Sequence, residues 1–201
     1  MAPPKNSWKD WVWLGWFAMQ VPVILSTQTQ ELTGVTATAG VDMVDKYPGF
    51  LIAEPGAPLH FLHRFRAWYI ATYNDPLMQW APEGAGDGGH SWIPLFFWLE
   101  LLFLLPVTLY GIRELGVRRR GTRGQTELLF VVYALEVAFT TLVVINDVSY
   151  WDPEVYSDEQ KNVFRFQLYG PYFVLPVIMA ADMYSRLLQR FGAADAVKKT
   201  Q

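Results

Sequence analysis

Residues 92–112 read WIPLFFWLELLFLLPVTLYGI and carry a single charged side chain, Glu100. A helix of about 20 apolar residues, rising about 1.5 Å per residue, crosses the ~30 Å hydrocarbon core of a bilayer. Two further runs have the same character, TELLFVVYALEVAFTTLVVIN at residues 126–146 and FQLYGPYFVLPVIMAADMYS at residues 166–185. These three runs predict transmembrane helices.

A fourth run, WKDWVWLGWFAMQVPVILST at residues 8–27, is less uniform because Lys9 and Asp10 stand at its start. From about Trp11 it is apolar, and its tryptophans form an aromatic belt typical of a membrane interface. A cleaved signal peptide is the competing interpretation, but the segment before the run is barely basic and no small-residue cleavage site closes it. We therefore predict an all-α membrane protein, a bundle of four helices at about 11–27, 92–112, 126–146 and 166–186. We expect one membrane domain over residues 1–201, with a cytosolic tail at 187–201.

The composition agrees with a membrane protein, since 52% of the 201 residues are hydrophobic and 16% are aromatic. There is no Cys and there are only three His. These counts exclude a disulfide framework and a thiolate metal site, and they leave few ligands for a His-based metal site. We expect no metal, no cofactor and no nucleic-acid partner.

The basic residues predict the orientation. Four spans place the N-terminus, the loop between spans two and three and the C-terminus on one side, which then holds 11 of the 16 Lys and Arg residues. These are Lys5, Lys9, Arg113, Arg118, Arg119, Arg120, Arg123, Arg186, Arg190, Lys198 and Lys199. The positive-inside rule puts that side, and both termini, in the cytosol.

The chain ends in Lys198-Lys199-Thr200-Gln201, a KKxx sequence. On a cytosolic tail, KKxx is a signal for retrieval to the endoplasmic reticulum. The alternative is that two lysines end a solvated tail by chance. We predict a multi-pass protein of the endoplasmic reticulum membrane.

The loop between spans one and two has two parts. Residues 31–59 are rich in Gly, Thr, Ala and Pro and predict a loop. Apolar residues then recur at helical spacing from Phe61 to Tyr73, so residues 59–73 predict an amphipathic helix that lies on the lumenal face or caps the bundle. Asp75-Pro76 ends it.

Two acids lie within predicted spans, Glu100 and Glu136. An ionised carboxylate in hydrocarbon is costly, so such residues face the bundle interior and mark a functional site by default. Helix geometry puts both at a similar depth, about 12 Å and about 14 Å from the lumenal surface. Both can open onto one cavity. The alternative is that each only hydrogen-bonds a neighbouring helix.

The surroundings of the two acids differ. Glu100 is flanked at helical spacing by Phe96, Phe97 and Phe103, which predicts a lipophilic pocket with an acid in it. Glu136 shares a helix face with Tyr133 and Thr140, which we also predict to be ligand-binding residues. Prolines in three spans, at Pro22, Pro106, Pro171 and Pro176, predict kinks that widen the bundle.

Four sequence pieces resemble the EXPERA-domain family, which includes the sigma-2 receptor type and, more distantly, the emopamil-binding-protein sterol isomerases. They are VPVIL at residues 21–25, Trp68-Tyr69 with Asp75-Pro76-Leu77, ELLFLLP at residues 100–106, and Tyr169-Gly170-Pro171-Tyr172 with Pro176. The resemblance to the sigma-2 type implies a sterol-binding membrane pocket. It assigns Glu100, Gln28, Asp75 and Tyr172 to the ligand site, and it also implies a structural role for Asp75. Gln28 replaces the Asp that pairs with ligand amines in that type, so a neutral sterol or terpenoid fits better than an amine.

Three functions follow as hypotheses. The first is binding of a sterol-like lipid, in sterol handling or with a lipid-transport protein as partner. The second is isomerisation or cyclisation of a sterol or terpenoid alkene by acid–base chemistry on Glu100 and Glu136, although span two lacks the His of the sterol isomerases. The third is a membrane interaction subunit without a ligand. The resemblance also implies a homodimer.

Overall fold

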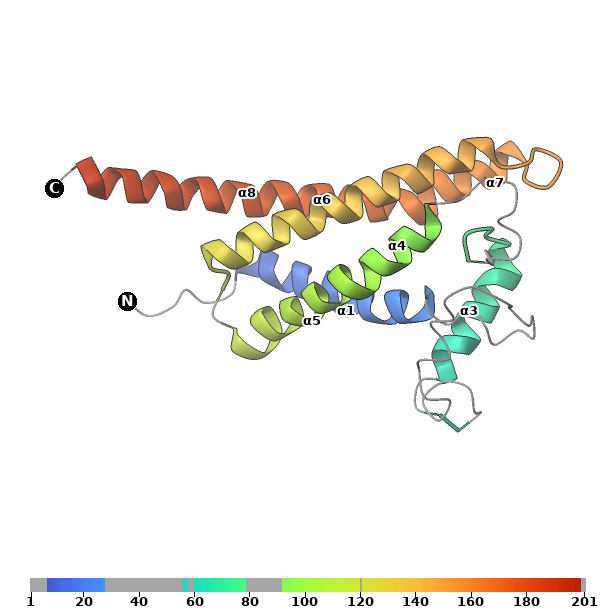
Figure 1. Ribbon diagram of the computed structural model, residues 1–201, viewed down its shortest axis with the longest axis horizontal. Coiled ribbons are helices and arrows are strands. Elements are labelled where there is room, and N and C mark those ends of the chain that lie inside the picture. The colour runs from blue at the N-terminus through green and yellow to red at the C-terminus, as the bar shows by residue number, and fades with distance from the viewer. Residues whose placement is uncertain (1–6, 28–55, 58–59, 79–91, 120, 200–201) are drawn as a thin grey trace. The chain divides into compact units, whose positions relative to one another are not determined.

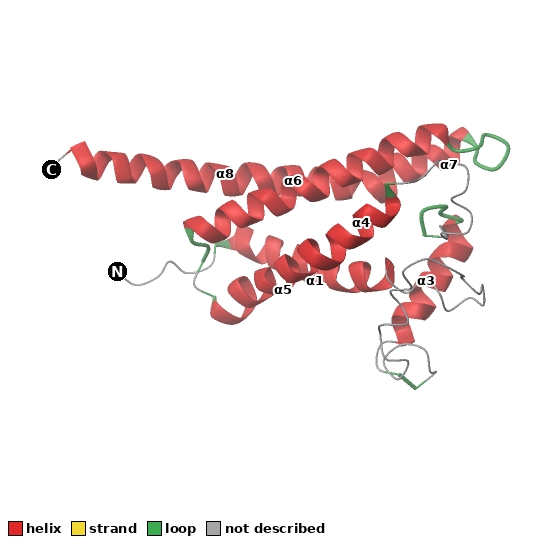
Figure 2. Cartoon of the chain, viewed as in Figure 1, coloured by secondary structure: helices red, strands yellow, loops and turns green. Residues whose placement is uncertain are grey.

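The computed structural model describes residues 7–27, 56–57, 60–78, 92–119 and 121–199, and every regular element within them is helical (Figures 1 and 2). Contacts divide the chain into two compact units. The first comprises residues 1–13 and 113–201, and the second residues 14–112. The helix α1 (Trp8–Thr27) contributes its first turns to the first unit and the rest to the second.

The first unit is built on α6 (Gly124–Asp147) and α8 (Tyr169–Lys199), which lie side by side (Figure 1). Buried side chains recur at helical spacing on both, at Phe130, Tyr133, Ala134, Val137 and Ala138 of α6 and at Met179, Ala180, Met183 and Leu187 of α8. Each helix therefore buries one stripe. Small residues in these stripes let the two backbones approach closely.

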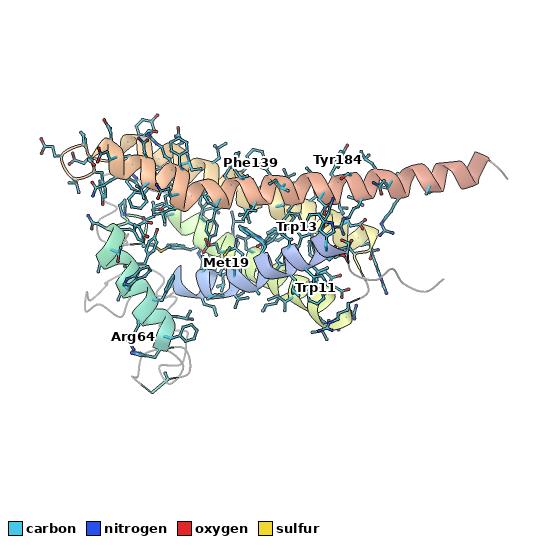
Figure 3. All side chains as sticks on the ribbon, turned by 180° about the vertical axis from the view of Figure 1, so that it is seen from behind. Trp11, Trp13, Met19, Arg64, Phe139 and Tyr184 are labelled. Carbon is cyan, nitrogen blue, oxygen red and sulfur yellow. The ribbon has the colours of Figure 1, made fainter. Side chains whose placement is uncertain are left out.

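The other faces of this pair are apolar and exposed. Phe139 and Tyr184, labelled in Figure 3, are 64% and 56% exposed, and Leu128 is 56% exposed. Apolar surface of this extent is unusual on a soluble protein. Three helical stretches are long and apolar enough to cross a membrane, Leu95–Arg118, Gly124–Tyr150 and Asp158–Ala194. The fold is that of a helical membrane protein.

The connection between α6 and α8 is closely packed. It contains the 3₁₀ turn Val148–Tyr150 and the short helix α7 (Asp158–Asn162), which begins at a capping box on Ser157. The buried Lys161 donates to the backbone carbonyl of Trp151 at 2.6 Å. The ring of Trp151 contacts that of Phe164 at 4.8 Å between centroids.

The second unit contains α3 (His60–Tyr73) and one continuous helix running from α4 (Ile93–Leu99) to α5 (Leu105–Ile112). The last turn of α5 passes close to α1. A Cβ built on Gly111 would lie 2.6 Å from the Phe17 ring, and both residues are buried. Only a glycine leaves room for that ring.

The winding of α4–α5 changes before Pro106, because proline has no N–H to bond the carbonyl four residues earlier. The segment Glu100–Leu104 is π-helical, and the N–H of Leu105 bonds the carbonyl of Glu100, five residues back. The segment Val163–Leu168, which precedes Pro171, is wound in the same way. The chain thus adapts to these two prolines by a local widening of the helix.

The predicted elements can now be compared with the observed ones. All four predicted spans are helical, and α3 starts within one residue of the predicted amphipathic helix. Asn74, with φ of 54°, follows the end of α3. The helix α1 is not among the three stretches that qualify as spans by length and composition, so its crossing stays a prediction. The predicted loop at 31–59 lies almost entirely outside the described residues.

We expect Gly111→Ala to lower the free energy of unfolding by about 1–3 kcal/mol, because the added methyl group overpacks the site against Phe17. The matched control is Gly15→Ala in α1, where an added Cβ meets nothing within 4 Å. The control should be neutral or slightly stabilising. Thermal unfolding in detergent measures both, and equal losses in the two variants would contradict the close approach of α5 and Phe17. The smaller side chain of Phe17→Leu should partly rescue Gly111→Ala.

Candidate functional site

The best-defined polar cluster of the first unit joins three segments that are far apart in the sequence. They are the first turns of α1, the residues around the start of α6, and the second half of α8. We call this cluster the charged network. Its members are Lys9, Asp10, Trp13, Thr122, Glu127, Asp182, Arg186 and Arg190.

Arg186 is the centre of the network. Its Nη1 donates to Oδ1 of Asp10 at 2.6 Å, and its Nη2 donates to Oδ2 of Asp182 at 2.7 Å. Both carboxylates are buried, with Asp10 2% and Asp182 8% exposed. Asp10 and Arg186 are separated by 176 positions. One guanidinium therefore ties the start of α1 to α8.

Asp182 receives two further donors from α1. The Nζ of Lys9 donates at 2.8 Å and the indole Nε1 of Trp13 at 2.9 Å. Trp13 is itself buried (labelled in Figure 3). A carboxylate with three side-chain donors is stable away from water, because charge-assisted hydrogen bonds offset its desolvation.

A second pair, Arg190 and Glu127, fastens the start of α6 to α8. Nε of Arg190 donates to Oε2 of Glu127 at 2.7 Å, and Nη2 donates to Oε1 at 2.9 Å. The Thr122 hydroxyl also donates to Oε1 of Glu127 at 2.7 Å. Glu127 is 1% exposed, whereas the Arg190 side chain is 47% exposed, so only the carboxylate of this bidentate pair is shielded from water.

Sequence reasoning did not identify this network. It counted Lys9, Arg186 and Arg190 only as basic residues on one side of the membrane. The signal available was the matching set of acids near the same helix ends. In particular, Asp182 and Arg186 are four residues apart, the spacing at which opposite charges pair on a helix.

Glu100, the acid singled out in span two, is half-buried and is the first residue of the π-helical segment Glu100–Leu104. Phe96, Phe97 and Phe103 are half-buried as well. Short π-helical segments inside α-helices occur frequently at functional sites. The acid is thus flanked along its own helix by aromatic residues, at a local irregularity of that helix.

Asp75 closes the end of α3. It is fully buried, and its carboxylate accepts from the Tyr69 hydroxyl at 2.9 Å and from the backbone N–H of Leu77 at 2.9 Å. These two bonds hold the turn that follows α3. These bonds stabilise the local backbone, and the predicted place of Asp75 in a ligand site stays a prediction.

Glu136 lies in the middle of α6, and both oxygens of its carboxylate are buried. Tyr133, one turn earlier, is fully buried. The Thr140 hydroxyl donates to the carbonyls of Glu136 and Val137, so its proton is used within the helix. Tyr172 is half-buried on α8.

The predicted pairing of the two acids stays a prediction, because Glu100 belongs to the second unit and Glu136 to the first. Gln28 lies outside the described residues, and so do the side chains of Lys198 and Lys199 at the end of α8. Over the described part of the chain, no three His, Asp or Glu side chains come together to hold a metal ion.

Comparison with known proteins shows similarity to a family and to a curated relative. A model of the EXPERA family, the expanded EBP superfamily, matches residues 61–183. A protein of Schizosaccharomyces pombe named "Efficient mitochondria targeting-associated protein 19" is 25% identical over 139 residues. That region is 69% of this chain and 66% of the relative, so the chain covers slightly less than two thirds of the relative's length. Asp75, Glu100 and Glu136 lie within the family match.

We expect Arg186→Ala to destabilise the protein by about 3 kcal/mol, because it leaves the buried Asp10 and part of the buried Asp182 uncompensated. The control is Arg118→Ala. Arg118 pairs with Glu114 four residues earlier, and its side chain is 43% exposed, so its loss should cost less than about 1 kcal/mol. Thermal unfolding in detergent compares the two variants. Equal effects would argue against Arg186 as the centre of the network.

Proposed function

Since this chain belongs to the EXPERA family, we propose that it is a four-span membrane protein of the endoplasmic reticulum that binds a sterol-like or terpenoid lipid beside Glu100 and serves sterol or lipid homeostasis. The observation that carries the proposal is the half-buried acid at the start of a π-helical segment among aromatic side chains.

The charged network supports the fourth span. It joins Asp10 to Thr122 through Arg186, which supports placing both residues on the same side of the membrane. The helix Leu95–Arg118 crosses once between them, so a second crossing is required. The helix α1 has 20 residues, which is long enough, whereas α3 has 14 and is too short. We assign the missing crossing to α1.

The basic residues support the orientation. The end of the protein that carries the network also carries Arg113, Arg118, Arg119 and Arg123. Under the positive-inside rule this end is cytosolic. The tail of α8 then lies in the cytosol, where Lys198 and Lys199 can act as a retrieval signal to the endoplasmic reticulum.

The aromatic side chains around Glu100 support the ligand class. Phenyl rings bury a flat, rigid hydrocarbon skeleton well, and one acid in such surroundings fixes its orientation by a hydrogen bond. A lipid with one hydroxyl group, such as a sterol or a terpenoid alcohol, fits both features.

A second candidate function is an enzyme that isomerises or cyclises a sterol or terpenoid alkene. The buried carboxylate of Glu136 favours it, because acid–base chemistry needs a second titratable group shielded from water. In this reading one carboxylic acid protonates the alkene and a second group accepts a proton from the resulting carbocation. Glu100 and Glu136 are the candidates for these two roles.

A third candidate follows from the relative's name, which associates the Schizosaccharomyces pombe protein with efficient mitochondria targeting. In this reading the chain assists delivery of other proteins and needs no lipid ligand.

Lipid mass spectrometry on the purified protein separates these functions. We expect a sterol-like lipid to co-purify with the wild type and to fall about tenfold or more in Glu100→Leu, which removes the hydrogen bond. Glu100→Gln should retain the lipid, because an amide still forms hydrogen bonds. The matched control is Glu114→Gln, which alters the acid that pairs with Arg118.

Incubation of the recovered lipid with the wild type tests turnover. A lipid that returns unchanged supports binding. An isomer that forms with the wild type and with neither Glu100→Gln nor Glu136→Gln supports the enzyme. A lipid content that is the same in wild type and Glu100→Leu would contradict the proposed site.

A further inference from the structure

The segment between the second and third predicted spans is strongly basic. Residues 113–123 read RELGVRRRGTR and contain five Arg and one Glu, a net charge of +4 within a chain of net charge −3. One membrane helix ends at Arg118 and the next begins at Gly124. The segment therefore covers the last turns of one membrane helix and the connection to the next, near the membrane boundary and the lipid headgroups.

The structure divides the arginines of this end into two groups. Arg186 and Arg190 are bonded to buried acids, and Arg118 is bonded to Glu114. Arg113, Arg119 and Arg123 are exposed. In the part of the chain that the structure describes, no carboxylate pairs with any of these three. We call them the loop arginines.

One loop arginine is positioned by its surroundings. The guanidinium carbon of Arg119 lies 5.6 Å from the centroid of the Trp11 ring, and its Nε donates to the carbonyl of Gly116 at 3.0 Å. Trp11 is 49% exposed. A tryptophan with a cation on its face is a typical anchor at a membrane interface.

We propose that the loop arginines bind the phosphate groups of anionic phospholipids in the leaflet next to them. A guanidinium forms paired hydrogen bonds with phosphate oxygens, and its weak hydration suits an interfacial site. Basic clusters next to a membrane helix attract acidic lipids by about 1 kcal/mol per residue. The ligand is a lipid because the bilayer holds phosphates at this depth at high local concentration. The proposal rests on the helix bounds, the charges and the exposure of the loop arginines, and is independent of a ligand at Glu100.

The test is native mass spectrometry of the full chain in detergent, titrated with phosphatidylserine or phosphatidylcholine. We expect the wild type to prefer phosphatidylserine, and Arg113→Gln/Arg119→Gln/Arg123→Gln to weaken its binding at least tenfold. Replacement of the same three residues by Lys should retain part of the preference. The control is Arg64→Gln/Arg165→Gln, which removes two arginines from α3 and from the π-helical segment before α8.

Three results would contradict the proposal, and a single variant replaces the triple variant if the latter does not fold. An unchanged phosphatidylserine preference in the triple Gln variant overturns the proposal. Equal competition by soluble glycerophosphoserine also overturns it, because the site would then bind a free phosphate ester. If the triple variant does not fold, Arg119→Gln replaces it, with an expected loss of about fivefold. A preference that is insensitive to raising salt from about 0.1 M to about 0.5 M counts against the proposal as well.

Discussion

A charged side chain inside or beside hydrocarbon must be paired, and Arg186 meets this requirement for two buried carboxylates at once. Asp10 and Asp182 would each destabilise a membrane helix if left alone. Bonded to one guanidinium, they hold the start of α1 against α8. Glu127 and Arg190 do the same for the start of α6. The first unit is therefore fastened at one end by ion pairs, and along its length by the buried apolar stripes of α6 and α8.

This arrangement constrains the rest of the proposed topology. Once the start of α1 and the loop before α6 share a side, the chain between them must cross the membrane an even number of times. In the proposed topology this sets the direction of the helix Leu95–Arg118, and with it the side of the membrane to which Glu100 is nearer. The proposed lipid site therefore depends on the charged network, although no residue of the network belongs to it.

The three long apolar helices could be predicted from the sequence because length and apolar character alone decide them. The amphipathic helix α3 could be predicted because its period is local. The network could not, since Asp10 and Arg186 are 176 positions apart and Glu127 and Arg190 are 63 apart. No local pattern shows which acid meets which base. The same basic residues predicted an orientation, but their separation into paired arginines and exposed loop arginines needed side-chain contacts.

The candidate site was predicted in part. The sequence identified Glu100, its aromatic neighbours and Pro106. It did not predict the π-helical winding before Pro106, because the backbone carbonyl that a proline leaves unbonded can be accommodated in several ways. It also placed Asp75 in the ligand site with a structural role, and the structure adds that its carboxylate accepts hydrogen bonds from Tyr69 and Leu77. The joint action of Glu100 and Glu136 depends on how the two units meet, and so it stays a prediction.

The central claim is that the start of α1 and the end of α8 share one side of the membrane, opposite the connection between α6 and α8. The chain has no Cys, so a single introduced cysteine is its only thiol. The measurement is labelling of Ser7→Cys, Gly192→Cys and Ser157→Cys in sealed microsomes with a membrane-impermeant maleimide. The account predicts that the first two react directly and that Ser157→Cys reacts only after permeabilisation. Labelling of only one of Ser7→Cys and Gly192→Cys, or of Ser157→Cys in sealed vesicles, would contradict it.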